Sequence, residues 1–103
     1  MRIGIYGGSY DPVHEGHLRA AEQVLRARRL DSVWLIPAAE PPHKRPCEAP
    51  FPDRLAMLEL AVEGRDGLVA CPVEGERPGP SYAVDTLEDL SRRRPDVAWE
   101  LLV

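Results

Sequence analysis

Gly7-Gly8-Ser9-Tyr10-Asp11-Pro12-Val13-His14-Glu15-Gly16-His17 is the stretch that decides the fold. It follows a short apolar run at residues 3–6 and precedes an amphipathic helical pattern over residues 14–29. A strand, a glycine-containing turn and a helix in this order place backbone N–H groups and a helix N-terminus around an anion. His14 and His17 stand one helical turn apart where that helix should begin. The stretch therefore predicts a nucleotide-handling site.

The glycines at the start of this stretch do not decide its role alone. We expect Gly7 and Gly8 to release the chain from strand geometry and to let a ligand approach the backbone. The pattern is neither G-x-G-x-x-G nor a P-loop, because no Gly-Lys-Ser/Thr follows. A tight turn without a ligand explains Gly7, Gly8 and Ser9 as well as phosphate binding does.

The two histidines favour phosphate binding. A cationic imidazole is unfavourable at a helix N-terminus, whereas a neutral imidazole still donates one N–H. Two alternatives stay open, namely plain surface residues and a metal-binding pair. Zinc needs three or four ligands, and no further His/Cys cluster is evident. We predict that His14 and His17 bind phosphate, and we expect no metal site built from the protein's own side chains.

The rest of the chain alternates strands with helices. Strands are predicted at residues 2–6, 33–36, 68–71 and 97–103, and helices at about 14–29, 52–64 and 81–93. This order implies a mainly parallel sheet with helices on both faces, a Rossmann-like α/β fold in one domain of residues 1–103. Loops 7–17, 37–52 and 72–81 all follow strands, so we expect them at one edge of the sheet, where ligands bind. Within the third of these segments, we expect residues 74–80 to form a charged loop.

Composition and charge exclude several classes of protein. The net charge of −4 argues against general nucleic-acid binding, which needs a basic surface. Residues 1–50 carry a balance of +1 and residues 51–103 a balance of −5, so cations for a phosphate must come mainly from the first half. No apolar run reaches about eighteen residues, and no secretory signal opens the chain, so we expect no membrane span and a cytoplasmic protein.

Lys44 is the best-placed candidate cation outside the first helix. It lies in a loop with six prolines at residues 37–52, a density that no regular element tolerates. Prolines on both sides limit the movement of Lys44, which favours a placed cation over a solvated one. Ser81 and Tyr82 stand at the start of the third helix, as a cap and a core aromatic or as a second wall for a ligand.

Four motifs in this chain resemble those of bacterial nicotinate-nucleotide adenylyltransferases, within the H-x-G-H nucleotidyltransferase superfamily. They are the stretch at 7–17, P-P-H-K at 41–44, R-L-A-M-L-E-L-A at 54–61 and G-P-S-Y-A-V-D-T-L at 79–87. H-x-G-H alone would not separate this family from phosphopantetheine or glycerol-phosphate relatives, whereas P-P-H-K and G-P-S-Y do. The resemblance implies a Rossmann-like fold and adenylyl transfer from ATP, with Mg²⁺, to nicotinate mononucleotide, giving deamido-NAD and pyrophosphate.

The resemblance also implies roles for individual residues. The ATP phosphates would be bound by Gly7, Gly8, Ser9, His14, His17 and Lys44, with His14 and His17 also catalytic. Nicotinate mononucleotide would be bordered by Tyr82, Ala83 and Thr86. Ala83 stands where the family usually has threonine, so only backbone contact is expected there.

Two alternatives to adenylyl transfer to nicotinate mononucleotide stay open. The sequence resembles the N-terminal portion of a longer enzyme, because the family's C-terminal S-x-T-x-x-R motif would follow the fourth strand. A nucleotide-binding module without transfer activity therefore remains an alternative. So does adenylyl transfer to another phosphate ester, such as nicotinamide mononucleotide or phosphopantetheine. Self-association of the chain into a homo-oligomer stays open as a further alternative.

Overall fold

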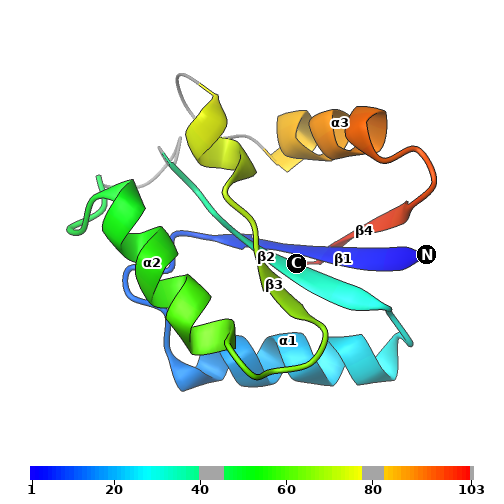
Figure 1. Ribbon diagram of the computed structural model, residues 1–103, viewed down its shortest axis with the longest axis horizontal. Helices are drawn as coiled ribbons and strands as arrows, with labels where there is room; N and C mark the ends of the chain where they lie inside the picture. The colour runs from blue at the N-terminus through cyan, green and yellow to red at the C-terminus, as the bar shows by residue number, and fades with distance from the viewer. Residues whose placement is uncertain (40–45, 78–82, 103) are drawn as a thin grey trace.

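The computed structural model describes residues 1–39, 46–77 and 83–102. In chain order, the elements are β1 (Arg2–Gly8), α1 (Glu15–Ala27), β2 (Ser32–Pro37), α2 (Phe51–Val62), β3 (Leu68–Ala70), a 3₁₀ turn η1 (Val73–Glu76), α3 (Ala83–Arg93) and β4 (Ala98–Leu102) (Figure 1). Each described helix lies between two strands in the sequence, which confirms the predicted α/β class. None of the helices in this part of the chain is long and apolar enough to span a membrane.

The strands form one parallel sheet in the order β3-β2-β1-β4. β1 is central and pairs with both β2 and β4, so that Gly4 is opposite Val33 on one side and Glu100 on the other. Parallel strands joined through helices place the helices on the faces of the sheet. The loops that follow β1 and β2 leave the same edge, as predicted for a Rossmann-like fold.

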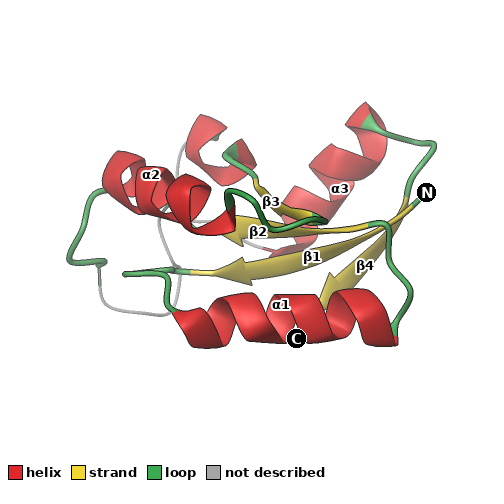
Figure 2. Ribbon diagram, turned by 60° about the horizontal axis from the view of Figure 1, so that its bottom comes forward, coloured by secondary structure: helices red, strands yellow, loops and turns green. Residues whose placement is uncertain are grey.

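Helices cover both faces of this sheet (Figures 1 and 2). On one face, Val33 and Leu35 of β2 pack in a buried cluster with residues of α1 and α2, among them Leu18 and Leu58. On the other face, Ile36 packs in a second cluster with residues that include Cys71, Val73 of η1 and Leu90 of α3. The side-chain alternation along β2 thus divides the core into two layers. Each layer fixes the position of one set of helices.

β1 is longer than the sequence pattern predicts. It continues through Gly7 and Gly8, which pair with Ile36 and Pro37, so the prediction that these glycines leave strand geometry was wrong. The physical reason is the length of β2, which is long enough to pair with β1 as far as Gly8. Just beyond the paired residues, Ala38 N–H donates to Gly8 O at 2.8 Å. The chain changes direction only at Tyr10, whose φ is 49°.

Residues 73–76 also differ from the prediction. They form the 3₁₀ turn η1 where a loop was expected, and Gly75 N–H donates to Pro72 O at 3.0 Å within it. Two of its side chains, Val73 and Glu74, are buried. A turn this short gives no periodicity that a sequence pattern could reveal.

Gly64 and Gly67 provide a matched test of the connection between α2 and β3. Their φ angles are 76° and 85°, a region that costs an L side chain about 1–2 kcal/mol. A Cβ at Gly67 would lie 2.7 Å from Leu25 Cδ2, whereas a Cβ at Gly64 would meet nothing within 4 Å. Because steric overlap adds to the backbone cost, we expect Gly67→Ala to lower the free energy of unfolding by about 2–4 kcal/mol and Gly64→Ala by about 1–2 kcal/mol. Urea unfolding measures both, and equal losses would show that Leu25 moves aside without cost.

Candidate functional site

A cleft of about 470 Å³ lies where β1 ends and α1 begins. The described residues that line it are Tyr6, Gly7, Gly8, Ser9, Tyr10, Asp11, Pro12, His14 and His17. Ligands of parallel α/β sheets bind beyond the carboxyl ends of the strands, which is where this cleft is. Most of the stretch that the sequence singled out therefore lines one cleft.

His14 and His17 together cap the N-terminus of α1. His14 is the N-cap residue, and its Nδ1 accepts a hydrogen bond from Gly16 N–H at 3.1 Å. His17 lies one turn further on, and its Nδ1 accepts from His14 N–H, also at 3.1 Å. These bonds satisfy N–H groups that would otherwise have no partner inside the helix. The two imidazole rings stack with their centroids 3.8 Å apart.

The capping bonds decide which nitrogen of each imidazole carries the proton. In a neutral imidazole, one nitrogen accepts and the other donates. Nδ1 is the acceptor in both His14 and His17, so each neutral ring has its N–H at Nε2. Two N–H donors therefore stand side by side at the positive end of the α1 dipole, a combination that suits a phosphate group.

Tyr10 supports the ring of His17. Its side chain is only 2% exposed, and its hydroxyl donates to Tyr6 O at 2.6 Å. The rings of Tyr10 and His17 meet edge to face with centroids 4.9 Å apart. Burial, and secondarily the neighbouring His14, lower the pKa of His17 below its ordinary value. His17 is therefore neutral at pH 7, as the donor arrangement requires.

Acidification is expected to destabilise the fold through His17. Because the pKa of His17 is lower in the folded chain, the unfolded chain binds the proton first, at its ordinary pKa of about 6.5. The stabilisation is present above that pH and is lost as pH falls from about 6.5 through the folded-state pKa. We expect the free energy of unfolding to fall between pH 7.5 and 5.5. Urea unfolding at both values should show a smaller fall in His17→Asn, and an equal fall would contradict this account.

Asp11 and Arg54 join the turn after β1 to the start of α2. The Asp11 carboxylate accepts hydrogen bonds from Glu48 N–H at 2.7 Å and Ala49 N–H at 3.1 Å. Arg54 donates to Ser9 O at 2.7 Å and to Ala49 O at 2.9 Å. Sequence reasoning assigned a role to neither residue. A signal for Arg54 was available, because it stands four residues before the buried Leu58 on the inner face of α2.

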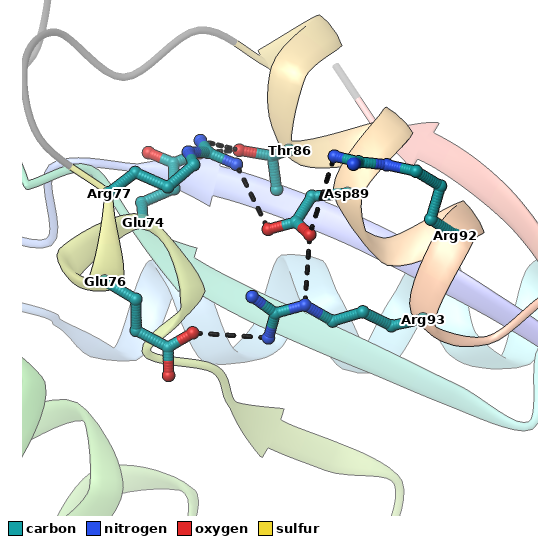
Figure 3. A network of polar contacts seen from close by, with 7 residues as sticks. All are labelled: Glu74, Glu76, Arg77, Thr86, Asp89, Arg92 and Arg93. Carbon is teal, nitrogen blue, oxygen red and sulfur yellow. Dashed lines mark hydrogen bonds and ion pairs between the residues drawn. The ribbon is translucent and has the colours of Figure 1, made fainter.

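Thr86 lies in a network of polar contacts between η1 and α3 (Figure 3). It is 1% exposed, donates to Glu74 Oε2 at 2.6 Å and accepts from Arg77 Nη2 at 2.7 Å. Arg77 also forms an ion pair with Asp89 at 3.7 Å. Thr86 is not among the described residues that line the cleft, and neither is the exposed Ala83. The structure thus uses the Thr86 hydroxyl to hold α3 to η1.

Some of the remaining predicted site residues line the cleft, and others are not among the described residues. Gly7, Gly8 and Ser9 line the cleft with the two histidines. Lys44 and Tyr82, together with Ser81, lie outside the described residues. Contact of Tyr82, Ala83 and Thr86 with a mononucleotide stays a prediction.

The described residues include no group of three or more His, Cys, Asp or Glu side chains that could hold a metal ion. Asp11 is the carboxylate among the described lining residues, and both of its oxygens accept backbone N–H groups of residues 48 and 49. This donor set does not suit a hard divalent cation, which prefers several oxygen ligands. Within the described part of the chain, a metal at this cleft would depend on ligands that the described side chains do not supply.

The sequence is similar to that of one family and of several curated proteins. A family model described as cytidylyltransferase-like matches residues 5–102. A probable nicotinate-nucleotide adenylyltransferase of Gemmatimonas aurantiaca is 48% identical over 103 residues, which cover 100% of this chain and 49% of that protein. A protein with the same description from Synechococcus sp. is 45% identical, covering 99% of this chain and 50% of that protein. The chain thus spans about half the length of these curated relatives.

Solved structures support the fold independently. A Plasmodium falciparum nicotinic acid mononucleotide adenylyltransferase complexed with NaAD superposes with a TM-score of 0.80 at 17% identity. The match covers 97% of this chain and 50% of that one. The same enzyme complexed with APC gives a TM-score of 0.76 at 16% identity, covering 97% and 49%. At these identities the likeness concerns the arrangement of strands and helices.

Proposed function

The chain belongs to the cytidylyltransferase-like family, and on that premise we propose that the protein transfers the adenylyl group of ATP to nicotinate mononucleotide. The products would be deamido-NAD and pyrophosphate, a cytoplasmic step of NAD biosynthesis. The observation that carries the proposal is the pair of Nε2–H donors of His14 and His17 at the N-terminus of α1. The names of relatives at 45% and 48% identity support the choice of acceptor.

The glycines of the cleft support a ligand that comes close to the backbone. Neither Gly7 nor Gly8 has a positive φ. A Cβ at Gly7 would come no closer than 3.9 Å to its neighbours, and a Cβ at Gly8 no closer than 3.5 Å. Neither backbone strain nor packing within the described chain therefore requires glycine there. Space for a phosphate against the backbone of β1 does explain both residues.

The chemistry of the proposed reaction needs positioned donors more than a proton acceptor. A phosphate oxygen of nicotinate mononucleotide, already anionic at neutral pH, attacks the α-phosphorus of ATP. A new P–O bond forms, the bond from the α-phosphorus to the bridging oxygen breaks, and pyrophosphate leaves. His14 and His17 would donate from Nε2 to phosphoryl oxygens on which charge develops, with the α1 dipole adding to the effect. Binding both substrates in line supplies the rest of the rate.

Mg²⁺, Lys44 and residues at the start of α3 would complete the site. Mg²⁺ would enter as the MgATP complex, since it commonly binds through substrate phosphates, and the described residues form no site for it alone. Lys44 would add a cation to the phosphates. Tyr82, Ala83 and Thr86 would form the border of the nicotinate mononucleotide site. Ala83 would contribute its backbone, and the Thr86 hydroxyl would hold the start of α3 in place.

An acceptor panel tests the proposed function. The protein that carries this chain is incubated with MgATP and nicotinate mononucleotide, nicotinamide mononucleotide or phosphopantetheine, and released pyrophosphate is measured. We expect pyrophosphate and deamido-NAD with nicotinate mononucleotide. Release with only one of the other acceptors would assign a different adenylyl acceptor. MgATP binding without pyrophosphate from any acceptor would instead indicate a nucleotide-binding module.

A further inference from the structure

Arg54 is an arginine with almost no contact with solvent. Its side chain is 1% exposed, although it lies on a helix of twelve residues at the surface of the molecule. Its guanidinium donates to four backbone carbonyls: Ser9 O and Ala38 O at 2.7 Å from Nη1, Ala49 O at 2.9 Å from Nε, and Ala39 O at 3.3 Å from Nη2. One side chain thereby joins the ends of β1 and β2 to the start of α2.

The charge of Arg54 has no carboxylate partner among the described residues. Each acceptor that it binds there is a neutral carbonyl, and none of the described ion pairs includes it. Burying a cation that has no anion among the described residues is costly, and an apolar side chain would fill the inner face of α2 at a lower cost in free energy. The guanidinium of Arg54 is hydrogen-bonded to the backbone of Ser9, which lines the cleft, so its positive charge lies close to the cleft. It adds positive potential where phosphates are proposed to bind.

The hydrogen bonds to Gly8 O and Ser9 O also fix the directions of the N–H groups in the turn after β1. In a trans peptide the N–H points opposite to the C=O. Gly8 O accepts from Ala38 N–H, so the N–H of Ser9 points away from β2. Ser9 O accepts from Arg54, so the N–H of Tyr10 points away from Arg54. Among the described residues neither N–H has a hydrogen-bond partner, and both residues line the cleft.

We propose that Arg54 is a positioning residue of the phosphate site. It holds the Ser9 carbonyl so that the N–H of Tyr10 faces the triphosphate, and it holds Ala38, whose N–H binds Gly8 O and thereby directs the N–H of Ser9 to the same side. This inference rests on the proposed function. Arg54 touches no substrate and acts through the backbone of Ser9 and Ala38. The planar guanidinium is required because its fixed donors reach carbonyls on three different segments at once. A lysine keeps the charge but presents a single ammonium on a flexible stem.

The test compares Arg54→Lys and Arg54→Met with the wild-type chain. MgATP affinity is measured by calorimetry, and the carbonyl ¹³C shifts of Ser9 and Ala38 are measured by NMR without ligand. We expect both variants to shift these two carbonyls and to bind MgATP at least tenfold more weakly. Arg93→Lys is the matched control, because Arg93 binds Asp89 at 3.0 Å on the other face of the sheet, and its affinity should stay within twofold.

The affinities and carbonyl shifts distinguish failure of the role of Arg54 from failure of the proposed function. Arg54→Lys with wild-type affinity would reduce the role to charge and overturn the inference. Shifted carbonyls with unchanged affinity in both variants would make Arg54 merely structural, which also overturns it. If the wild-type protein that carries this chain binds no MgATP, the proposed function fails, whereas loss of affinity confined to the Arg54 variants supports both.

A measurement on the wild type keeps the inference testable if the Arg54 variants do not fold. The Nε–Hε signal of Arg54 should exchange slowly with solvent and shift when MgATP is added. The Nε–Hε signal of Arg19, whose side chain is 77% exposed, serves as the control and should exchange rapidly. MgATP-induced shifts at the Ser9 and Tyr10 amides without any shift at Arg54 would contradict the inference.

Discussion

In the proposed reaction, His17→Ala is expected to lower the turnover number for deamido-NAD formation by about 10²–10³-fold, with a smaller effect on ATP affinity. The reason is the Nε2–H of His17, which is the donor because Nδ1 already accepts from His14 N–H. A preorganised donor aimed at developing charge contributes most in the transition state, about 3–4 kcal/mol. Steady-state kinetics with MgATP and nicotinate mononucleotide measure the effect. A fall of less than about tenfold would remove His17 from the transition state.

Two further substitutions of His17 separate its catalytic role from its capping role. The amide oxygen of His17→Asn can take the place of Nδ1 and keep the bond from His14 N–H, but nothing replaces Nε2. The amide nitrogen of His17→Gln reaches the place of Nε2 and keeps a donor there. We expect Asn to retain stability and lose activity as Ala does. We expect Gln to retain more activity than Asn, with about 1 kcal/mol of stability lost with the cap. The reverse order of activities would contradict the assignment of the donor.

Tyr10→Ala is expected to lower the free energy of unfolding by about 3–5 kcal/mol. Tyr10 is 2% exposed and packs in the same cluster as Leu18 and Leu58, so its removal leaves a cavity beneath the cleft. That loss is a large share of the about 5–15 kcal/mol by which a domain is stable. Removing the ring also exposes His17 to water, so the pKa of His17 should rise toward its ordinary value. Urea unfolding and an NMR titration of His17 measure the two effects.

Tyr10→Phe is the control for this substitution. It keeps the ring against His17 and removes only the hydroxyl that donates to Tyr6 O, which is worth about 1 kcal/mol. We expect the pKa of His17 to stay lowered in this variant. A cost below about 1.5 kcal/mol for Tyr10→Ala would show that the ring is not part of the core that supports the cleft.

The sequence predicts the fold well where the signal is local. Apolar runs such as residues 33–36 and amphipathic stretches such as 14–29 have periods that depend only on their own residues, and β2 and α1 form there. The ends of the elements depend on neighbours that the local pattern does not contain. Gly7 and Gly8 stay in β1 because β2 is long enough to pair with them. No property of two glycines reveals the length of another strand.

The candidate site shows the same division. His14 and His17 could be identified because their spacing and their place before a helical pattern are local features. The roles of Arg54 and Thr86 could not, because their partners are distant in sequence. Arg54 binds Ser9, 45 residues away, and Thr86 binds Glu74, 12 residues away. The sequence signal for Arg54 is its place on the apolar stripe of α2, in line with the buried Leu58.

A crystal structure of the chain with a non-hydrolysable ATP analogue tests the central claim most directly. We expect phosphate oxygens at about 2.7–3.2 Å from the Nε2 atoms of His14 and His17 and from the N–H groups of the Ser9–Tyr10 turn. A nucleotide bound elsewhere with this cleft empty, or bound here with both imidazoles turned away from its phosphates, would contradict the account.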